Sequence, residues 1–311
     1  MNTATHNATL PFTLDQVDQI IANSTNTDIH LAKEMIESLL SRKGKRIRAQ
    51  LVLHVANLFC KPDNNAYKLA AIIELIHVAT LLHDDVIDES TLRRGSASTC
   101  SRFGNAQAVL AGDFLYSNAF ILISELRHDQ VLSHLAQTTS KIVEGEIDQL
   151  ANENALITRE KYYEIITAKT GLLFSASAKC AALLYTNDAL CYEKAGLELG
   201  IGYQILDDLL DYDIKNTAWG KNIGDDIRQG KCTLPLIMFA QQNPGTNLQQ
   251  LSSKSSDEID AIMHHIANSN ILTQCREQAI THIETAQKLF RSAKNHQMMM
   301  QFCDQIKIRQ R

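Results

Sequence analysis

Two aspartate clusters with identical spacing, each following a long apolar run, constrain this chain more than any other feature. The first has the sequence HDDVID at residues 83–88 and follows the run 69–82, which contains neither Gly nor Pro. An uninterrupted run of good helix formers predicts a helix. Carboxylates three and four residues apart share one stripe of that helix and repel one another, so the grouping requires compensating cations.

The second cluster repeats this pattern after the mainly apolar run 197–203. A single acidic cluster is often only a solvated surface feature, but two in apolar helices, where charge is costly, favour a metal site. Mg²⁺ takes one or two carboxylates and completes its shell with water and phosphate oxygens. We therefore expect Mg²⁺ to bind the aspartates of both clusters, which are Asp84, Asp85, Asp88, Asp207, Asp208 and Asp211.

The remaining sequence predicts one all-α domain spanning residues 1–311. The chain has 45% hydrophobic residues, 13 Gly and 4 Pro, with few alternating β-type runs, and this content suffices for a large core. We find no solenoid-period repeat and no low-complexity linker. Residues 1–12 are expected to be loose, and the first helix is expected to begin near Thr13.

Several classes of protein are disfavoured by charge and cysteine content. A net charge of −5 argues against a general nucleic-acid binder. The seven cysteines form no CxxC pair and are odd in number, which indicates reduced thiols and neither a disulfide framework nor a zinc site. The polar N-terminus does not resemble a signal peptide, and no uncharged apolar run reaches transmembrane length. We expect a cytoplasmic protein.

A basic segment at residues 42–48 carries five cations in seven residues. A solvated turn or a nucleic-acid patch is the plain interpretation. Gly44, however, lets the backbone turn while Lys45 and Arg48 point the same way, which favours a second phosphate site beside the metal clusters. His77 lies seven residues before Asp84, on the same helical face, and is either an ordinary core residue or an anion contact.

Further cations follow each aspartate cluster. Arg93 and Arg94 come directly after the first cluster, and arginine binds phosphate oxygens bidentately. Lys169, before Thr170, lies in a mostly apolar helix and needs a partner unless it reaches solvent. Lys221 and Lys231 each follow a glycine in the segment after the second cluster. That segment is either a solvated loop or a flexible lid that places cations over a metal-bound phosphate.

Taken in order, these motifs resemble those of the trans-isoprenyl diphosphate synthases. The resemblance covers roughly residues 30–240 and rests on GKRIR (44–48), LLHDDVIDES with RRG (81–95), GDFLYSNAF (112–120), GEIDQL (145–150), KT (169–170), YQILDDLLDY (203–212) and GKNIGDDIRQGKCTLP (220–235). Within the family, the chain is most similar to the bacterial octaprenyl diphosphate synthases. The resemblance implies a single-domain helical bundle around a deep central cavity, and a homodimer.

The resemblance also implies residue roles. The six aspartates would hold about two or three Mg²⁺ ions. The allylic diphosphate would contact Arg93, Lys169, Thr170, Gln204, Lys221 and Lys231. Isopentenyl diphosphate would contact Gly44, Lys45, Arg48, His77 and Arg94. Catalysis is expected to depend most on Asp84, Asp85, Asp88, Asp207, Asp208, Lys169 and Lys221.

The implied reaction joins isopentenyl diphosphate repeatedly to an allylic starter such as farnesyl diphosphate. The octaprenyl product would supply quinone side chains and could bring the enzyme into peripheral contact with a membrane. Three positions depart from the family pattern: Ala49 replaces Pro, Cys232 replaces Pro, and Tyr203 replaces Phe. None of these changes removes a charged ligand.

Alternatives remain at the level of product and role. A class I terpene cyclase is disfavoured because the second cluster is again DDxxD. A non-catalytic subunit is disfavoured because both clusters are intact, and a shorter-chain synthase stays open. By resemblance, bulky residues just before the first cluster block product growth; the small Ala79 and Thr80 therefore imply a long product, with Leu135 a candidate for the cavity floor.

Overall fold

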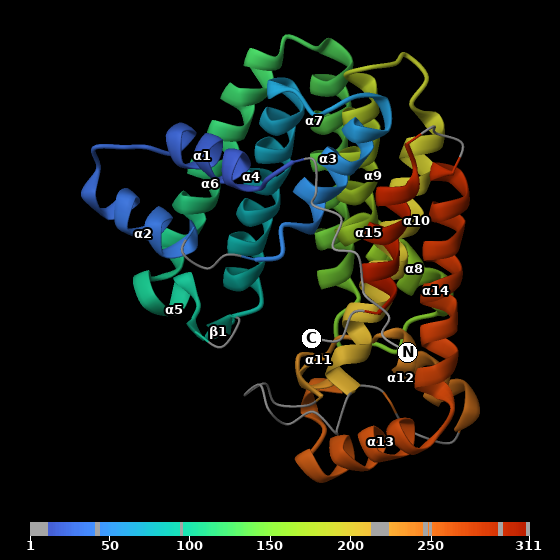
Figure 1. Ribbon diagram of the computed structural model, residues 1–311. Helices are drawn as coiled ribbons and strands as arrows, with labels where there is room; N and C mark the ends of the chain where they lie inside the picture. Colours follow the sequence, from blue (N-terminus) through green and yellow to red (C-terminus); the bar gives the residue numbers. More distant parts are fainter. Residues whose placement is uncertain are drawn as a thin grey trace, which may run out of the picture.

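The computed structural model describes most of the chain. The described residues are 12–40, 44–93, 96–212, 224–244, 248, 251–291 and 295–308, with only the backbone described for Leu92, Arg93 and Ser96. Long, roughly parallel and antiparallel helices form the centre of the molecule, and shorter elements flank them (Figure 1). The expected all-α class is confirmed, apart from one hairpin of two-residue strands.

The N-terminal half forms one side of the bundle. Its elements are α1 (Asp15–Ser24), α2 (His30–Leu40), α3 (Ile47–Phe59), α4 (Asn64–Ile87), β1 (Leu92–Arg93), β2 (Ser96–Ala97), α5 (Thr99–Phe103), α6 (Asn105–Leu126) and α7 (Asp129–Ala151). The central helix α4 packs along α6 and also against α3 and α1. It therefore carries the first aspartate cluster from the core to the end of the bundle.

The C-terminal half completes the bundle around α10. Its elements are α8 (Arg159–Ile166), the π-helical turn η1 (Thr167–Gly171), α9 (Leu172–Leu183), α10 (Leu190–Asp208), the 3₁₀ turn η2 (Leu209–Tyr212), α11 (Asp225–Arg228), α12 (Leu234–Gln242), the 3₁₀ turn η4 (Leu251–Ser253), α13 (Ser256–Asn268), α14 (Ile271–Phe290) and α15 (Gln297–Lys307). Helix α10 packs between α9 and α14. The second aspartate cluster thus lies at the end of another central helix.

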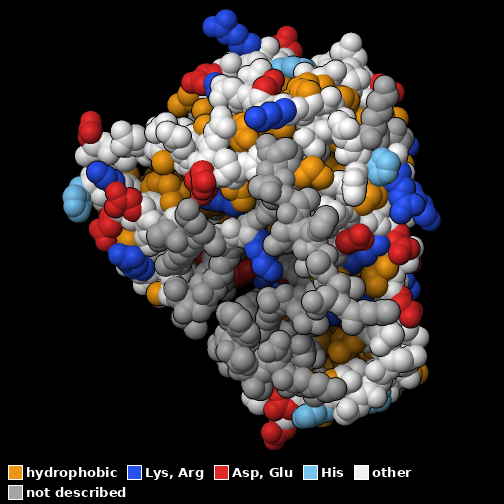
Figure 2. Space-filling model, in the orientation of Figure 1, with side chains coloured by type: hydrophobic (Ala, Val, Ile, Leu, Met, Phe, Trp, Pro, Cys, Tyr) orange, Lys and Arg blue, Asp and Glu red, His pale blue; other side chains and the backbone are white. Residues whose placement is uncertain are grey.

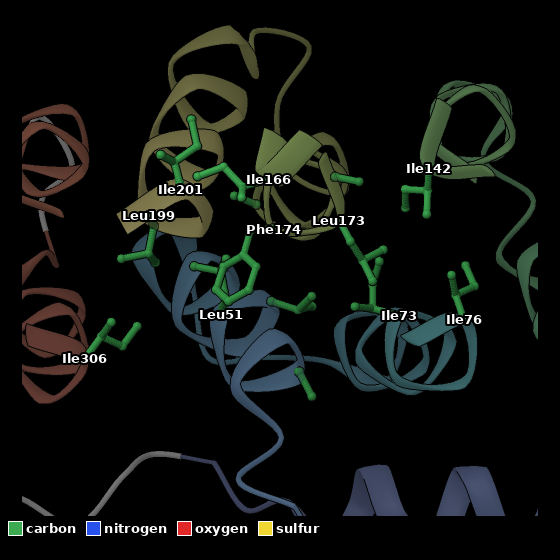
Figure 3. Close-up of a cluster of buried hydrophobic side chains, with 14 of the residues drawn as sticks. Leu51, Ile73, Ile76, Ile142, Ile166, Leu173, Phe174, Leu199, Ile201 and Ile306 are labelled. Carbon is green, nitrogen blue, oxygen red and sulfur yellow. The ribbon is translucent and has the colours of Figure 1, made fainter. Parts of the chain in front are cut away.

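The core is a single contiguous cluster of buried hydrophobic side chains. Figure 3 shows Phe174 of α9 pointing towards Leu51 of α3, while Ile142 of α7 and Ile76 of α4 point towards each other. Phe174 and Leu51 are fully buried, and burying such side chains stabilises the fold by about 1.5–3 kcal/mol each. Apolar residues at helical spacing therefore hold together the helices that carry the two clusters.

Two predicted helices end or change pitch where the sequence gives no warning. The apolar segment around Lys169 was expected to be a continuous helix, yet residues Thr167–Gly171 form a π-helical turn between α8 and α9. Helix α10 ends at Asp208, and the chain tightens into a 3₁₀ turn that includes Asp211. Asp211 therefore does not continue the α-helical stripe of Asp207 and Asp208.

Helix α6 is long and strongly apolar. By length and composition alone it would qualify as a membrane-crossing helix, although a core helix of a soluble protein meets the same criterion and 44% of its most apolar window is buried. Its exposed side includes Leu110, Phe120 and Ile121.

The predicted loose segment 1–12 lies outside the described residues except for Phe12, which is buried and packs edge-on against His54. All seven cysteines are free, as their number and spacing predicted.

Candidate active site

The first aspartate cluster occupies the end of α4. Asp84 and Asp85 belong to the last helical turn, and Asp88 is the residue that ends the helix, with its N–H donating to the carbonyl of Asp84 at 2.8 Å. Asp85 is 3% exposed, whereas the side chains of Asp84 and Asp88 are partly accessible. The helix therefore presents Asp84 and Asp88 more openly than Asp85.

Lysine side chains from two distant segments reach this cluster. Lys231 donates to Asp88 Oδ2 at 2.8 Å. Lys169 Nζ lies 3.8 Å from Asp84 Oδ2 and 3.0 Å from Glu146 Oε2 of α7. These lysines supply compensating cations, which the sequence had not placed beside the carboxylates. Both lysines were predicted as diphosphate contacts, and their position beside the carboxylates is compatible with that role.

Electrostatics keep Lys169 charged. Burial acts to lower its pKa, but the carboxylates of Asp84 and Glu146 outweigh burial, and the net effect raises the pKa above the ordinary lysine value. Asp84 also influences Tyr116 of α6: burial and the charge of Asp84 raise the pKa of this tyrosine to about 12. The site therefore holds a protonated lysine between two acidic groups.

Asp208 of the second cluster accepts hydrogen bonds from uncharged donors. Asp208 Oδ2 accepts a hydrogen bond from the hydroxyl of Tyr162 at 2.6 Å, and Asp208 Oδ1 accepts one from Gln204 Nε2 at 2.7 Å. Gln204 in turn accepts a hydrogen bond from Thr170 Oγ1 at 2.6 Å. Asp208 is 8% exposed, so both of its oxygens are engaged inside the protein.

Burial dominates the titration of this carboxyl. It raises the pKa of Asp208 to about 7, with Asp207 and Asp211 adding to the effect and the bonds from Tyr162 and Gln204 opposing it. A carboxylate in such a position gains from any nearby cation. Burial therefore destabilises the charged form of Asp208 by more than its two hydrogen bonds stabilise that form.

Asp211 faces backbone groups. Its Oδ1 and Oδ2 accept hydrogen bonds from the N–H groups of Asp225 at 3.2 Å and Asp226 at 3.1 Å. These are the first residues of α11, whose N–H groups have no partner within the helix. Asp211 thus fastens α11 to the end of α10, which fixes the start of the segment that leads to Lys231.

Two connections bring the aspartate clusters to one place. Lys169 reaches Asp84, and its neighbour Thr170 reaches Gln204 and hence Asp208. On the other side, Asp211 holds α11, and Lys231 just beyond it reaches Asp88. Figure 2 shows a hollow near the middle of the face in view, with acidic and basic side chains visible in it.

Carboxylate oxygens from both clusters suit a hard divalent cation. Among the residues that the structure describes, no three carboxylate, His or Cys groups converge into a closed ligand set. An ion held here would complete its shell with water and substrate oxygens, which is how Mg²⁺ is usually bound. The donor set therefore fits Mg²⁺ bound together with a phosphate-bearing ligand.

The predicted isopentenyl residues divide into two groups. Arg48 of α3 lies 3.1 Å from Nε2 of His77 on α4, and its guanidinium stacks over the Phe174 ring at 4.8 Å. Lys45 is exposed and Gly44 is partly buried. The structure thus brings together Arg48 and His77, two residues that the resemblance assigns to the same diphosphate.

Arg46, between these residues, has a structural environment that the sequence did not reveal. It adopts a left-handed backbone conformation with φ 49° and binds Asp18 of α1 and Glu74 of α4, both at 3.2 Å. Glu74 also accepts the N–H of Ala49 at 3.1 Å. A proline, which the family has at position 49, could not make this bond.

The other two departures sit in ordinary surroundings. Tyr203 is half-buried with its ring 5.1 Å from that of Phe174, so the tyrosine fills a place among aromatic groups. Cys232 follows Lys231, and burial raises the pKa of its thiol to about 11. This thiol is therefore protonated at neutral pH.

The candidate chain-length residues lie on different faces. Ala79 is fully buried; one turn before it, Leu75 lines a small cavity with Leu115 of α6, and one turn after it, His83 packs so closely on Gly112 of α6 that a Cβ there would overlap the ring. Ala79 therefore faces α6.

Thr80 is half-buried four residues before Asp84 on the same face, and its hydroxyl donates to the carbonyl of His77. Leu135 of α7 is 1% exposed.

Some predicted residues cannot be placed. The side chain of Arg93 and all of Arg94 and Lys221 lie outside the described residues. Conversely, Tyr162 and Glu146 contact the site but were not predicted. Glu146 lies in the GEIDQL motif, which was a usable signal, while nothing in the sequence marked Tyr162.

Comparison with known proteins agrees with this geometry. A family model for polyprenyl synthetases matches residues 29–268. Octaprenyl diphosphate synthase of Escherichia coli (strain K12) is 42% identical over 229 residues, which cover 71% of this chain and 70% of that protein. All-trans-nonaprenyl-diphosphate synthase (geranyl-diphosphate specific) of Rhodobacter capsulatus is 35% identical over 279 residues, covering 87% and 86%.

A solved structure resembles the whole fold. Polyprenyl synthase from Caulobacter crescentus CB15, complexed with calcium and isoprenyl diphosphate, has a TM-score of 0.89 and 32% identity, and the match covers 96% of this chain and 95% of that one. The range matched by the family model includes α4 and α10, the helices that carry the two aspartate clusters. The chain therefore belongs to the polyprenyl synthetase family and is a prenyltransferase of the all-helical isoprenoid synthase fold.

Proposed function

We propose that this protein is a long-chain trans-polyprenyl diphosphate synthase that makes octaprenyl diphosphate for quinone side chains. The substrates are isopentenyl diphosphate and an allylic starter, farnesyl diphosphate. The observation that carries the proposal is the pair of carboxylate clusters, the first of which already has Lys169 and Lys231 beside Asp84 and Asp88. The similarity to the Escherichia coli octaprenyl enzyme supports the product length.

We assign Mg²⁺ to the accessible carboxylates Asp84 and Asp88 of the first cluster and to Asp207 of the second. Asp85, Asp208 and Asp211 support them from buried positions. The calcium-bound Caulobacter crescentus structure supports divalent-metal binding in the family. When bound, Mg²⁺ would supply positive charge to the diphosphate group as it leaves the allylic carbon.

The protein's own cations have a complementary task. Lys169 and Lys231 exchange their carboxylate partners for diphosphate oxygens, which stabilises the leaving group as the allylic C–O bond breaks and its electron pair departs with the diphosphate. Burial around Lys169 strengthens this attraction because the local dielectric is low. Thr170 and Gln204 orient the same group through hydrogen bonds.

Arg48 and His77 position the second substrate. With Lys45 and Gly44 they hold the diphosphate of isopentenyl diphosphate, so that its double bond faces the allylic carbon. The double bond attacks that carbon, a new C–C bond forms, and a proton leaves the adjacent carbon for the released pyrophosphate. The aromatic face of Phe174, over which Arg48 stacks, fixes the guanidinium direction.

We also infer a cytoplasmic homodimer, with peripheral membrane contact when product is released. The exposed apolar side chains along one face of α6, Val109, Leu110, Phe120 and Ile121, support an interface there. Exposed apolar side chains that gather on one helix can mark an interaction site. Sedimentation analysis tests this point, since Leu110→Glu should convert the dimer to a monomer while Leu156→Glu should not.

Product analysis tests the function directly. The protein is incubated with farnesyl diphosphate, isopentenyl diphosphate and Mg²⁺, and products are sized by mass spectrometry; octaprenyl diphosphate is expected. A geranylgeranyl product would establish the shorter-chain alternative, and no product with intact folding would establish a non-catalytic subunit. Thr80→Phe should shorten the product because Thr80 shares the face of Asp84, and Leu135→Ala should lengthen it. Ala79→Tyr should also shorten the product, but with a loss of stability because Ala79 faces α6.

A further inference from the structure

A buried tyrosine touches the second aspartate cluster from behind. Tyr162 of α8 is 2% exposed, and its hydroxyl donates to Asp208 Oδ2 at 2.6 Å. A buried phenol requires an acceptor, and a carboxylate is the strongest one available.

The segment 162–170 is also connected to Asp208 at its other end, through Thr170. Eight residues after Tyr162, Thr170 donates to Gln204, and Gln204 donates to Asp208 Oδ1. The segment 162–170 is therefore tied to α10 at both ends, and both ties meet at one carboxylate. Asp208 makes both connections because each of its two carboxylate oxygens accepts one hydrogen bond, from Tyr162 or from Gln204.

The π-helical turn η1 lies between these two ties and carries Lys169. Lys169 Nζ extends the other way, towards Glu146 and Asp84. A second constraint holds the turn from the side of α7, where a Cβ at Gly145 would overlap the Cβ of Ala168. With its ends tied to α10 and its middle against α7, the turn has one direction in which to present Lys169.

We propose that Tyr162 is a positioning residue for the allylic diphosphate site, acting through Asp208 on the segment that presents Lys169 and Thr170. This inference rests on the proposed function for its choice of substrate. A core tyrosine with a satisfied hydroxyl is the competing interpretation. The two differ in a measurable way, because loss of a core hydrogen bond lowers stability alone, whereas loss of positioning weakens diphosphate binding selectively.

The experiment compares Tyr162→Phe with Tyr163→Phe. Tyr163 is the adjacent residue on the same helix, and its hydroxyl donates to Gln278 at 3.1 Å, away from both clusters. Each variant loses one hydroxyl and keeps its ring. Steady-state constants for both substrates are measured, together with the calorimetric affinity for inorganic pyrophosphate in the presence of Mn²⁺, which requires no turnover.

Tyr162→Phe is expected to raise the KM for farnesyl diphosphate about tenfold and to weaken pyrophosphate binding similarly, as expected for losing a hydrogen bond to a charged group. The KM for isopentenyl diphosphate should stay within about twofold. Tyr163→Phe should leave all three values at the wild-type level. In an Asp208→Asn background, Tyr162→Phe should have little further effect, since the two residues act as one unit.

Three results would overturn the proposal. They are a lower melting temperature with unchanged binding, equal increases in both KM values, and full additivity with Asp208→Asn. If the wild-type protein makes no polyprenyl product, the proposed function fails, yet the pyrophosphate affinities of the two variants still decide the role of Tyr162.

Discussion

The two aspartate clusters have one spacing and two environments. In the first, Lys231 and Lys169 reach Asp88 and Asp84 from segments far along the chain. In the second, Asp208 and Asp211 are engaged by a phenol, an amide and backbone N–H groups. The first cluster is therefore compensated by side chains that can move to a ligand, and the second is fixed by groups that belong to the framework.

This difference shows that a motif defines residue types but not their roles. A lysine on a flexible stem can exchange a carboxylate for a phosphate oxygen at little cost, because both are anions. A buried hydrogen bond to Asp208 cannot be exchanged so easily, since the donor would be left without a partner. The first cluster is suited to receive ligands, and the second to hold the receiving geometry constant.

The contrast between the two clusters requires that both take part in metal binding. Asp84→Ala and Asp207→Ala should each lower turnover by about 10³-fold or more, because each removes charge that stabilises the leaving diphosphate. The helical circular dichroism should persist in both variants. Removal of metal with EDTA should abolish activity, and Mg²⁺ should restore it. Near-normal turnover in either variant would refute the metal assignment.

The framework role of Asp208 has a pH signature in the metal-free protein. Its folded pKa is about 7, above the ordinary value near 4, so the stabilising protonated form is lost as the pH rises through 7. From pH 5 to pH 8 the free energy of unfolding should fall by about 3 kcal/mol more in the wild type than in Asp208→Asn. Urea unfolding in EDTA measures this difference, and parallel pH profiles would contradict it.

Lys231→Ala tests whether this lysine of the first cluster serves ligand binding or the framework. The KM for the allylic diphosphate should rise about tenfold, because one cation is lost from the site. Stability should change by less than about 1 kcal/mol, since the pair with Asp88 is partly exposed. Lys161→Ala, which removes another salt-bridged lysine, is the control and should leave the KM unchanged. A large loss of stability in Lys231→Ala would place this lysine in the framework instead.

The smallest expected effect concerns Asp211. Asp211→Ala removes the acceptors of the first N–H groups of α11 and should cost about 1 kcal/mol, as for loss of a helix cap. Hydrogen exchange at Asp225 and Asp226 should become faster, whereas Asp211→Asn, which keeps one carbonyl oxygen, should show an intermediate rate. Unchanged exchange in Asp211→Ala would mean that α11 is held by other contacts.

The helical class and the site's main members could be predicted from sequence because they depend on local spacing. Asp84, Asp85 and Asp88 fall at the end of an apolar run, and a seven-residue separation places His77 on the face of Asp84. In these cases short-range geometry carries nearly all of the information.

Contacts that depend on tertiary packing could not be predicted in the same way. Asp211 has the spacing of Asp88, yet the chain tightens into a 3₁₀ turn before it, which spacing does not reveal. Tyr162 is one of two adjacent tyrosines, and only the packing of α8 on α10 decides which of them meets Asp208. Arg46 looks like Lys45 and Arg48 in sequence, but its ion pairs with Asp18 and Glu74 turn it away from them.

The π-helical turn η1 makes the length of its segment as important as its composition. A π turn holds one residue more than the α-helix on either side of it. If the segment from Tyr162 to Thr170 were α-helical throughout, the same eight-residue separation would turn Thr170 by about 100° relative to Tyr162. Lys169 and Thr170 could no longer face α7 and α10 at the same time. The extra residue of η1 therefore keeps Tyr162 and Thr170 on one side of the segment, as residues seven apart are in a regular α-helix, and one further inserted residue should disturb the site.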